Sequence, residues 1–208
     1  MDNSKVKYTF ICGASEYTKS ILFESAVYWS ELGLKVVFIQ ISQMSALPFP
    51  IDGASPPSVQ ALNRITFLTL SRWQDVIHYT SSIHEAYPNV PRVILVSDLH
   101  DYYSDVNDDN NQIMLAHMLC ANLRDAITYT SRVCDCESYL IISAQDTLLE
   151  TEKLSTMYFP SGTWLAKVID SKVEVVKKLL YPQNSNYKIT FSLLNNKIRC
   201  DTVEMLYR

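Results

Sequence analysis

The segment Cys12-Gly13-Ala14-Ser15-Glu16-Tyr17-Thr18-Lys19-Ser20 follows an apolar run and precedes a run that is typical of a helix. Its spacing agrees with the phosphate-binding loop G-x-x-x-x-G-K-[ST] at Gly13, Lys19 and Ser20. In such a loop, backbone N–H groups surround phosphate oxygens at the positive end of a helix. The pattern therefore predicts that Gly13, Thr18, Lys19 and Ser20 contact a nucleotide, with Lys19 on the phosphates and Ser20 on Mg²⁺.

Thr18 departs from the consensus because it stands where the loop has its second glycine. A glycine at that place lets the backbone approach the ligand closely and adopt unusual φ and ψ angles, which a β-branched residue resists. Two interpretations follow. The segment is a damaged nucleotide site, or it keeps the shape of the loop without the ligand.

Length and composition indicate an intracellular globular protein. The chain has 208 residues, of which 48% are hydrophobic and 19% charged, so one sizeable domain is expected. No apolar run is long enough to span a bilayer, and the first residues lack the apolar stretch of a signal peptide. Five cysteines, an odd number, favour reduced thiols over a disulfide framework.

Charge is distributed unevenly along the chain. Residues 1–150 carry a balance of −8, whereas residues 151–208 carry +4. A basic tail of this kind is suited to nucleic-acid phosphates, although solvated strand faces give the same pattern. The candidate DNA-binding residues on the predicted tail strands are Lys167, Lys172, Lys177, Lys178, Lys188 and Arg199.

Hydrophobic periodicity predicts alternating strands and helices, followed by strands alone. Strands are predicted over 7–12, 35–41, 64–70, 93–96 and 139–144, and helices over 19–32, 71–86 and 112–132. Tail strands are predicted over 163–169, 173–180, 188–194 and 197–203, with turns at Asp170-Ser171 and Asn195-Asn196. The prediction is an α/β fold: one domain over 1–208, with a mostly parallel core at about 7–150 and antiparallel β-hairpins at about 151–208.

This arrangement resembles the RecA-type ATPase core, with the phosphate-binding loop first. The resemblance implies an Mg²⁺-orienting acid after the strand at 93–96, where Ser97 stands at the expected position and Asp98 one residue later. It also implies that Gln145, after the strand at 139–144, senses the γ-phosphate. Asp98 and Gln145 are therefore the candidate catalytic residues, and Ser20 and Asp98 the candidate Mg²⁺ ligands.

The RecA-type resemblance further implies a water-activating acid after the second strand. Gln40 and Ser42 stand near that place, and neither side chain is a general base at neutral pH. The sequence therefore predicts weak ATP and Mg²⁺ binding and little or no hydrolysis. The alternative is a genuine DNA-stimulated ATPase that uses Lys19, Ser20 and Asp98. An inactive P-loop protein of another lineage, such as a small nucleotide kinase, agrees less well because arginine is sparse.

A more specific similarity is to the small ATPase-like subunit of metazoan Shu complexes. Short stretches in matching order carry it, namely the phosphate-binding loop, residues 44–48 and 63–67, residues 99–102, and residues 158–160 with 164–165. The resemblance implies a nuclear homologous-recombination factor that pairs with a SWIM-domain zinc-finger protein. Such a hetero-oligomer is expected to bind single-stranded DNA and to stabilise filaments of a RecA-family recombinase.

Two further motifs receive simpler interpretations. Cys134-Asp135-Cys136 lacks a second ligand cluster, so it predicts a turn between helix and strand and no structural zinc. Tyr102 and Tyr103 precede an acidic loop, which favours a contact with a protein partner over stacking on bases.

Overall fold

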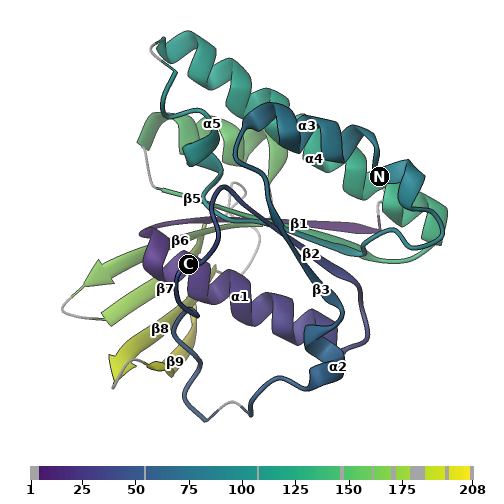
Figure 1. Cartoon of the computed structure of the whole chain (residues 1–208). Coiled ribbons are helices and arrows are strands. Elements are labelled where there is room, and N and C mark those ends of the chain that lie inside the picture. The colour runs from purple at the N-terminus through teal and green to yellow at the C-terminus, as the bar shows by residue number, and fades with distance from the viewer. Residues whose placement is uncertain are drawn as a thin grey trace.

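A sheet of nine strands, in the order β3-β2-β4-β5-β1-β6-β7-β8-β9, runs through the part of the chain that the computed structural model describes. The described residues are 5–53, 55–106, 108–145, 148–160, 162–169, 172–178, 186–194 and 197–206. The predicted turns at Asp170-Ser171 and Asn195-Asn196 lie outside these residues. The strand order places β1 in the middle, between a parallel and an antiparallel half (Figure 1).

The parallel half consists of β1 (Val6–Cys12), β2 (Val36–Gln40), β3 (Ile65–Thr69), β4 (Val93–Val96) and β5 (Ser138–Ala144). All pairings among these strands are parallel. Every residue of β2 and β4 is buried, as continuous apolar runs predict for strands covered on both faces.

Helices cover both faces of the parallel strands (Figure 1). One face carries α1 (Ser15–Glu31) with the short α2 (Val59–Leu62) beside it. The other carries α3 (Trp73–Ser81), α4 (Asp109–Cys134) and α5 (Leu148–Tyr158), while the 3₁₀ turns η1 (Ile83–Ala86) and η2 (Leu99–Tyr102) follow α3 and β4. Two hydrophobic cores result, one on each face of the sheet.

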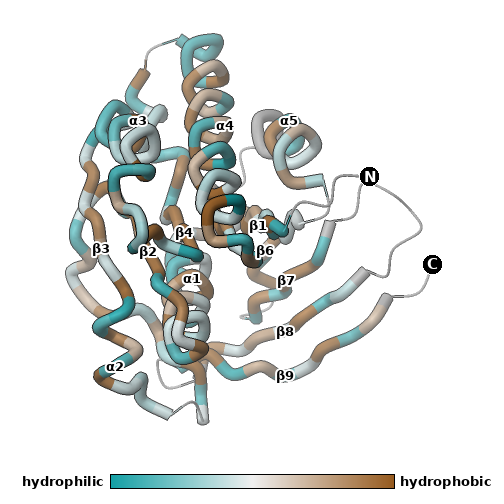
Figure 2. Tube along the Cα trace, turned by 90° about the vertical axis from the view of Figure 1, so that its right-hand side faces the viewer, coloured by the Kyte–Doolittle hydropathy of each residue, from teal (hydrophilic) through white to brown (hydrophobic). Residues whose placement is uncertain are grey.

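The antiparallel half begins with β6 (Thr163–Ile169), which lies parallel to β1. It continues antiparallel through β7 (Lys172–Lys178), β8 (Asn186–Leu194) and β9 (Lys197–Leu206). In Figure 2, β8 and β9 extend away from the helices that cover the parallel strands. A small third core joins β6 and β7 to one end of α1.

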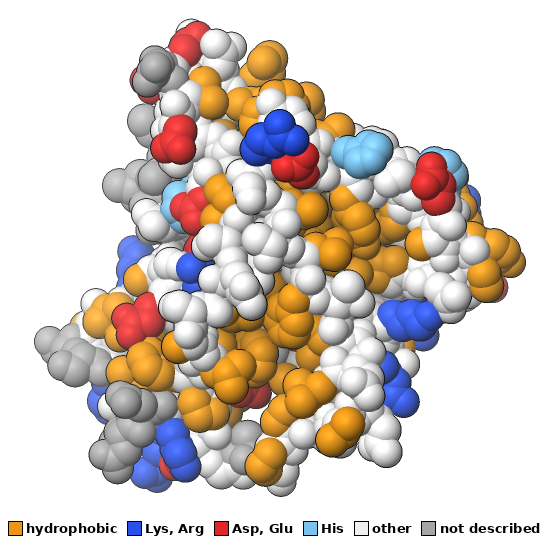
Figure 3. All heavy atoms as spheres, viewed as in Figure 1, with side chains coloured by type: hydrophobic (Ala, Val, Ile, Leu, Met, Phe, Trp, Pro, Cys, Tyr) orange, Lys and Arg blue, Asp and Glu red, His pale blue; other side chains and the backbone are white. Residues whose placement is uncertain are grey.

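The surface around α1 carries several exposed apolar side chains. On the face seen in Figure 3, hydrophobic side chains reach the surface in the middle and lower parts. Exposed large hydrophobic residues on α1, on α2 and on the segment between β2 and α2 include Tyr28, Leu32, Leu47, Ile51, Val59 and Leu62. No described helix is both long enough and apolar enough to cross a bilayer.

The predicted α/β fold with antiparallel C-terminal strands is confirmed, and the strands at 93–96 and 163–169 have the predicted bounds. The helix predicted over 71–86 is instead α3 followed by η1, and Arg72 precedes α3 without a side-chain cap. Neither α2 nor α5 was predicted. The largest error concerns α1, which begins at Ser15 rather than at residue 19.

Candidate functional site

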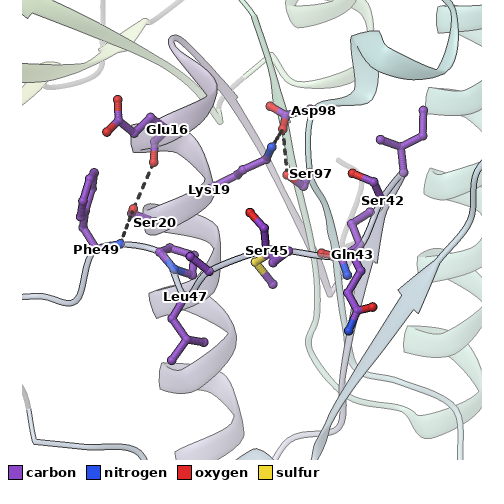
Figure 4. A pocket seen from close by; sticks show the side chains of 15 residues that line it. Glu16, Lys19, Ser20, Ser42, Gln43, Ser45, Leu47, Phe49, Ser97 and Asp98 are labelled. Atoms are coloured by element: carbon purple, nitrogen blue, oxygen red, sulfur yellow. Dashed lines mark hydrogen bonds and ion pairs between the residues drawn. The ribbon is translucent and has the colours of Figure 1, made fainter.

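A cavity of about 350 Å³ lies where β2 and β4 end and α1 begins. Ligands of open α/β sheets bind in this kind of crevice, at the carboxyl ends of the strands. Figure 4 shows Lys19 and Asp98 pointing toward one another across it, whereas the Glu16 carboxylate points away from Lys19. The capping segment, residues 42–49, walls the cavity together with Glu16, Lys19, Ser20, Gln40, Ile41, Ser97 and Asp98.

Helix α1 occupies most of the segment in which the consensus has a phosphate-binding loop. The N–H groups of Tyr17 and Thr18 each donate to the Ala14 carbonyl at 3.1 Å, as in the first turn of a helix. Thr18 is fully buried, and its hydroxyl donates to the Ser15 carbonyl at 3.2 Å. A threonine favours this turn where glycine would permit an open loop. The early start of α1 therefore gives these N–H groups backbone partners.

Gly13 is required by its neighbours in the sheet. Its N–H donates to the Ala144 carbonyl at 3.0 Å, which continues the pairing of β1 with β5. A Cβ atom on Gly13 would lie 2.5 Å from the Ala166 carbonyl oxygen and 2.7 Å from the Ala166 Cβ. The close approach of β6 thus explains this glycine without any ligand.

Lys19 and Asp98 form an ion pair, with 2.9 Å between Nζ and Oδ2. The Asp98 side chain is 3% exposed and that of Lys19 is 41% exposed. Asp98 has the left-handed angles φ 51 and ψ 58, and its N–H donates to the Ser143 hydroxyl at 2.9 Å. This turn brings the carboxylate into the cavity, although Asp98 stands one residue past the position that the resemblance implies.

Hydroxyl groups complete the surroundings of Asp98 Oδ2. Ser15 donates to it at 2.8 Å and Ser97 at 3.2 Å, in addition to Lys19. The second oxygen, Oδ1, is buried without a hydrogen-bond partner among the described residues, and so is Oε1 of Gln40. Both residues line the cavity, but these two oxygen atoms have almost no accessible surface, so a hydrogen-bond donor or a hard cation could reach them only after a local rearrangement.

Ser20, the candidate Mg²⁺ ligand, is fully buried and its hydroxyl is engaged on both sides. It donates to the Glu16 carbonyl at 3.1 Å and accepts from the Phe49 N–H at 3.2 Å (Figure 4). The backbone of the capping segment is thus hydrogen-bonded to the hydroxyl that a metal ion would need. The described residues contain no cluster of three or more His, Cys, Asp or Glu side chains placed to hold a metal ion.

Gln145, the candidate γ-phosphate sensor, lies exposed beyond β5 and is not among the described residues that line the cavity. Its backbone N–H donates to His100 Nδ1 at 3.3 Å, and His100 Nε2 lies 2.7 Å from Asp101 Oδ1. Burial raises the pKa of the Asp101 carboxyl, and His100 opposes that shift. Gln145 is therefore connected to Asp98 indirectly, through His100 of η2 and through Ser143 of β5.

Strand register divides the basic candidates of the tail between two faces. Lys177 lies opposite Trp164 on the side of α1, with its ammonium 5.9 Å from the indole ring. On the other face, Lys188 pairs with Glu174 at 2.6 Å and Lys172 with Asp201 at 3.5 Å. The hydrogen bond to Glu174 raises the pKa of Lys188.

The remaining candidates share that outer face with Lys172 and Lys188. Lys167 lies opposite Glu174 in the pairing of β6 with β7, and Arg199 lies opposite Ser192 in the pairing of β8 with β9. Both side chains are exposed, and neither has an ion pair among the described residues. The side chain of Lys178 lies outside the described part. Lys167 and Arg199 are therefore the cations of this set most accessible to a phosphate.

Comparisons with known proteins identify the fold. No protein-family model matches the chain, and no curated protein matches its sequence. Among solved structures, the RadB recombinase superposes with a TM-score of 0.61 and 13% identity, over 94% of this chain and 91% of that one. The chain has a RecA-like fold. Two other similar structures agree with this assignment.

The first of them is a KaiC-like protein from the hyperthermophilic archaeon Pyrococcus horikoshii, with a TM-score of 0.60 and 8% identity over 96% of this chain and 91% of that one. The second is a DnaB-like replicative helicase, from a structure concerned with its interactions with primase. It has a TM-score of 0.55 and 9% identity over 95% of this chain and 58% of that one. At these identities the comparisons establish the architecture.

Sequence reasoning missed several residues that shape the site. Ser15 and Ser143 bind Asp98, and the capping segment closes over Ser20. A signal for Ser15 was present, because Thr18 in place of glycine favours an earlier helix start. The contacts of Ser143 and Phe49 depend on tertiary structure, since their partners lie 45 and 29 residues away.

Proposed function

We propose that this RecA-like chain is a nuclear recombination factor that acts as a scaffold with little or no ATP hydrolysis. It pairs with a SWIM-domain zinc-finger subunit of the Shu type, binds single-stranded DNA and stabilises filaments of a RecA-family recombinase. The observation that carries the proposal is the ion pair between Lys19 and Asp98. The cation that is expected on the phosphates and the acid that is expected near Mg²⁺ bind one another in this structure.

Phosphoryl transfer requires groups that neutralise the phosphates, hold the metal ion and position the attacking water. Lys19 is paired with Asp98, and the Ser20 hydroxyl is bound by Glu16 and Phe49. Gln40 ends β2 where the RecA resemblance implies an acid, and an amide cannot accept a proton at neutral pH. Each requirement is thus met poorly in this arrangement, which supports a scaffold over an enzyme.

The residues present fit ATP and Mg²⁺ in part. Asp98 Oδ1 and Gln40 Oε1 are buried acceptors without a partner among the described residues, and a small rearrangement of these two cavity-lining residues would turn them toward the water shell of a magnesium ion. Lys19 could hold a phosphate after release from Asp98, and Ser20 could reach the metal after release from Phe49. When bound, magnesium would neutralise phosphate charge. Because two existing contacts oppose loading, we propose weak nucleotide binding.

A DNA-stimulated ATPase is the second candidate. The cavity of about 350 Å³ favours it, because Lys19 and Asp98 both line that space. Such an enzyme would need DNA or a partner to release the capping segment from Ser20. The outer face of the tail, with Lys167 and Arg199, is the proposed contact for single-stranded DNA through its phosphates.

The substitution Lys19→Arg distinguishes the two candidates. Arginine keeps the charge opposite Asp98, but its larger, planar guanidinium has a different geometry from the compact lysine ammonium and should change the contact with a phosphate. A scaffold should retain co-purification with the SWIM-domain partner and stabilisation of recombinase filaments on single-stranded DNA. Lys5→Arg is the matched control, because Lys5 forms an exposed ion pair with Asp135 at 2.6 Å, outside the cavity lining. Loss of filament stabilisation together with loss of ATP turnover in Lys19→Arg alone would establish the ATPase instead.

A further inference from the structure

The outer edge of β9 is largely unpaired in the described structure. On its inner side β9 pairs with β8. On its outer side the chain reaches it only at Ile198, whose N–H donates to the Pro50 carbonyl at 2.8 Å and whose carbonyl accepts from the Asp52 N–H at 2.7 Å. Beyond Ile198 no described segment pairs with this edge. Open strand edges are templates for pairing with another chain.

The side chains of β9 alternate between two faces of the sheet, and a β-bulge shifts this alternation by one residue. Thr190 lies opposite Thr202 and Phe191 opposite Cys200, so Asp201 is the extra residue. The apolar side chains of β9 therefore share the face that also carries Phe191 and packs toward α1, namely Ile198, Cys200, Val203 and Met205. Val203 is 65% exposed and Met205 is 41% exposed. This apolar row runs beside an edge that no described strand covers.

The other face of β9 carries polar residues with opposite charges near its two ends. Arg199 lies opposite Ser192, and Glu204 lies opposite Lys188. Both are exposed. In the structure Lys188 is bound to Glu174 rather than to Glu204. A charge of each sign is thus displayed on the same face of one edge strand.

This pattern is self-complementary for an antiparallel second copy. If Cys200 lies opposite Val203 of a second copy, Arg199 lies opposite its Glu204. Residues 50–52 already pair with Ile198, so Met205 of the second copy must displace that contact to lie opposite Ile198. Each pair joins residues from the same face, because the bulge at Asp201 shifts the alternation by one position. Apolar residues then meet apolar ones, and the two-fold symmetry repeats the charge pair.

We propose that this chain self-associates through β9, which pairs antiparallel with β9 of a second copy and joins two sheets into one. The charge pair between Arg199 and Glu204 sets the register, and the row from Cys200 to Met205 is extended across the junction. The contact is short, so the expected dimer is weak and concentration-dependent. The inference is independent of the proposed recombination role, because it concerns a strand edge outside the candidate nucleotide site.

A charge exchange tests the register directly in the full chain. Arg199→Glu places two acids opposite one another, and Glu204→Arg places two cations opposite one another. Sedimentation velocity over a range of concentrations should show dimer formation by the wild type. For each single variant the dissociation constant should rise at least about tenfold, because two symmetric pairs change from attraction to repulsion. An equal mixture of the two variants should recover a heterodimer.

Recovery in the mixture separates the proposal from a simple loss of folding, since a misfolded variant cannot regain a specific dimer. Lys7→Glu and Glu85→Arg are control charge changes at exposed positions away from β9 and should leave self-association unchanged. A second test uses Val203→Cys under mild oxidation. It should form a disulfide-linked dimer with Cys200 of the second copy, and Cys200→Ser in the same chain should abolish that dimer.

Three outcomes would overturn the proposal. The wild type could sediment as a monomer at every concentration, which leaves the edge for a different protein. Dimer stability could be unaffected by the two charge variants, which places the contact on another surface. The disulfide-linked dimer could persist after Cys200→Ser, which indicates pairing in another register.

Discussion

The two halves of the sheet bury their strand residues to different extents. In the parallel half, β1–β5 lie between helices on both faces, and every residue of β2 and β4 is buried. In the antiparallel half, β9 ends the sheet and leaves Val203 65% and Met205 41% exposed. The first half holds the cavity with Lys19 and Asp98, and the second displays charges and apolar side chains on its surface.

The parallel half should therefore determine the stability of the fold, whereas the antiparallel half should determine what the chain binds. The parallel half contains two of the three hydrophobic cores, so its side chains determine whether the chain folds. The outer strands of the antiparallel half contribute little to those cores, and we propose that they contact DNA and a second copy of the chain. Substitutions in the two halves should therefore have effects of different size and kind.

The largest expected effect is at the junction of the halves. A Cβ atom on Gly162 would overlap the Tyr8 carbonyl oxygen, which belongs to the backbone of β1 and has little room to move. Gly162→Ala should lower the free energy of unfolding by about 3 kcal/mol or more, as measured by urea denaturation. Gly53→Ala is the control, because a Cβ added at Gly53 would meet no described atom within 4 Å. It should cost only the strain of a positive φ, about 1 kcal/mol.

A core substitution compares the halves themselves. Leu123 on α4 is fully buried in the largest core. Leu123→Ala should therefore cost about 3 kcal/mol through lost burial and a cavity. Val203→Ala on β9 removes an exposed side chain and should change the stability of the monomer by less than about 0.5 kcal/mol. Equal losses for the two variants would show that the antiparallel half is as tightly integrated as the parallel one.

The ion pair of the candidate site should stabilise the fold. Lys19→Ala leaves the nearly buried Asp98 carboxylate with the Ser15 and Ser97 hydroxyls as its described partners. The substitution should cost about 2 kcal/mol, because Lys19 itself is half-exposed. The exposed pair of Lys5 with Asp135 is the control, and Lys5→Ala should cost less than about 0.5 kcal/mol. A Lys19→Ala variant as stable as the wild type would contradict the assignment of a structural role to this pair.

Alkaline pH should lower the stability of the fold through Cys120, which is buried beside the parallel half. Burial raises the pKa of the Cys120 thiol from 9.0 to about 12, so the folded state keeps a proton that the unfolded state loses. Stability from this group should therefore fall as pH rises above about 9, by about 1 to 2 kcal/mol near pH 10 to 10.5. Cys120→Ala should reduce that slope in urea titrations at several pH values. Leu123→Ala, which removes no titrating group from the same core, is the control and should leave the slope unchanged.

Continuous apolar runs and the shift to alternating strands were sufficient to predict the fold. The run Val93–Val96 is a buried strand with the bounds that its composition predicts. The tail strand Thr163–Ile169 is likewise where alternation and flanking turn residues place it. The short α2 and the helix α5 were missed because neither has a strong apolar period of its own.

The site was predictable in its residues and less so in its geometry. Lys19 and Asp98 were both identified, but a motif written as a loop does not reveal that α1 begins at Ser15. The left-handed turn at Asp98 and the bond from Phe49 to Ser20 arise from packing between distant segments. Gly13 agrees with the motif, yet the close approach of β6 is a sufficient physical reason for it.

The most direct test of the account is a titration of fluorescent ATP with Mg²⁺ into the wild type, Lys19→Ala and Thr18→Gly. If the site is held closed by its own contacts, the wild type should show no saturable binding at micromolar nucleotide, and Lys19→Ala should not differ. Thr18→Gly should gain binding, because glycine permits the first turn of α1 to open into a loop. Micromolar, Mg²⁺-dependent binding by the wild type that is lost in Lys19→Ala would contradict the account and establish a working nucleotide site.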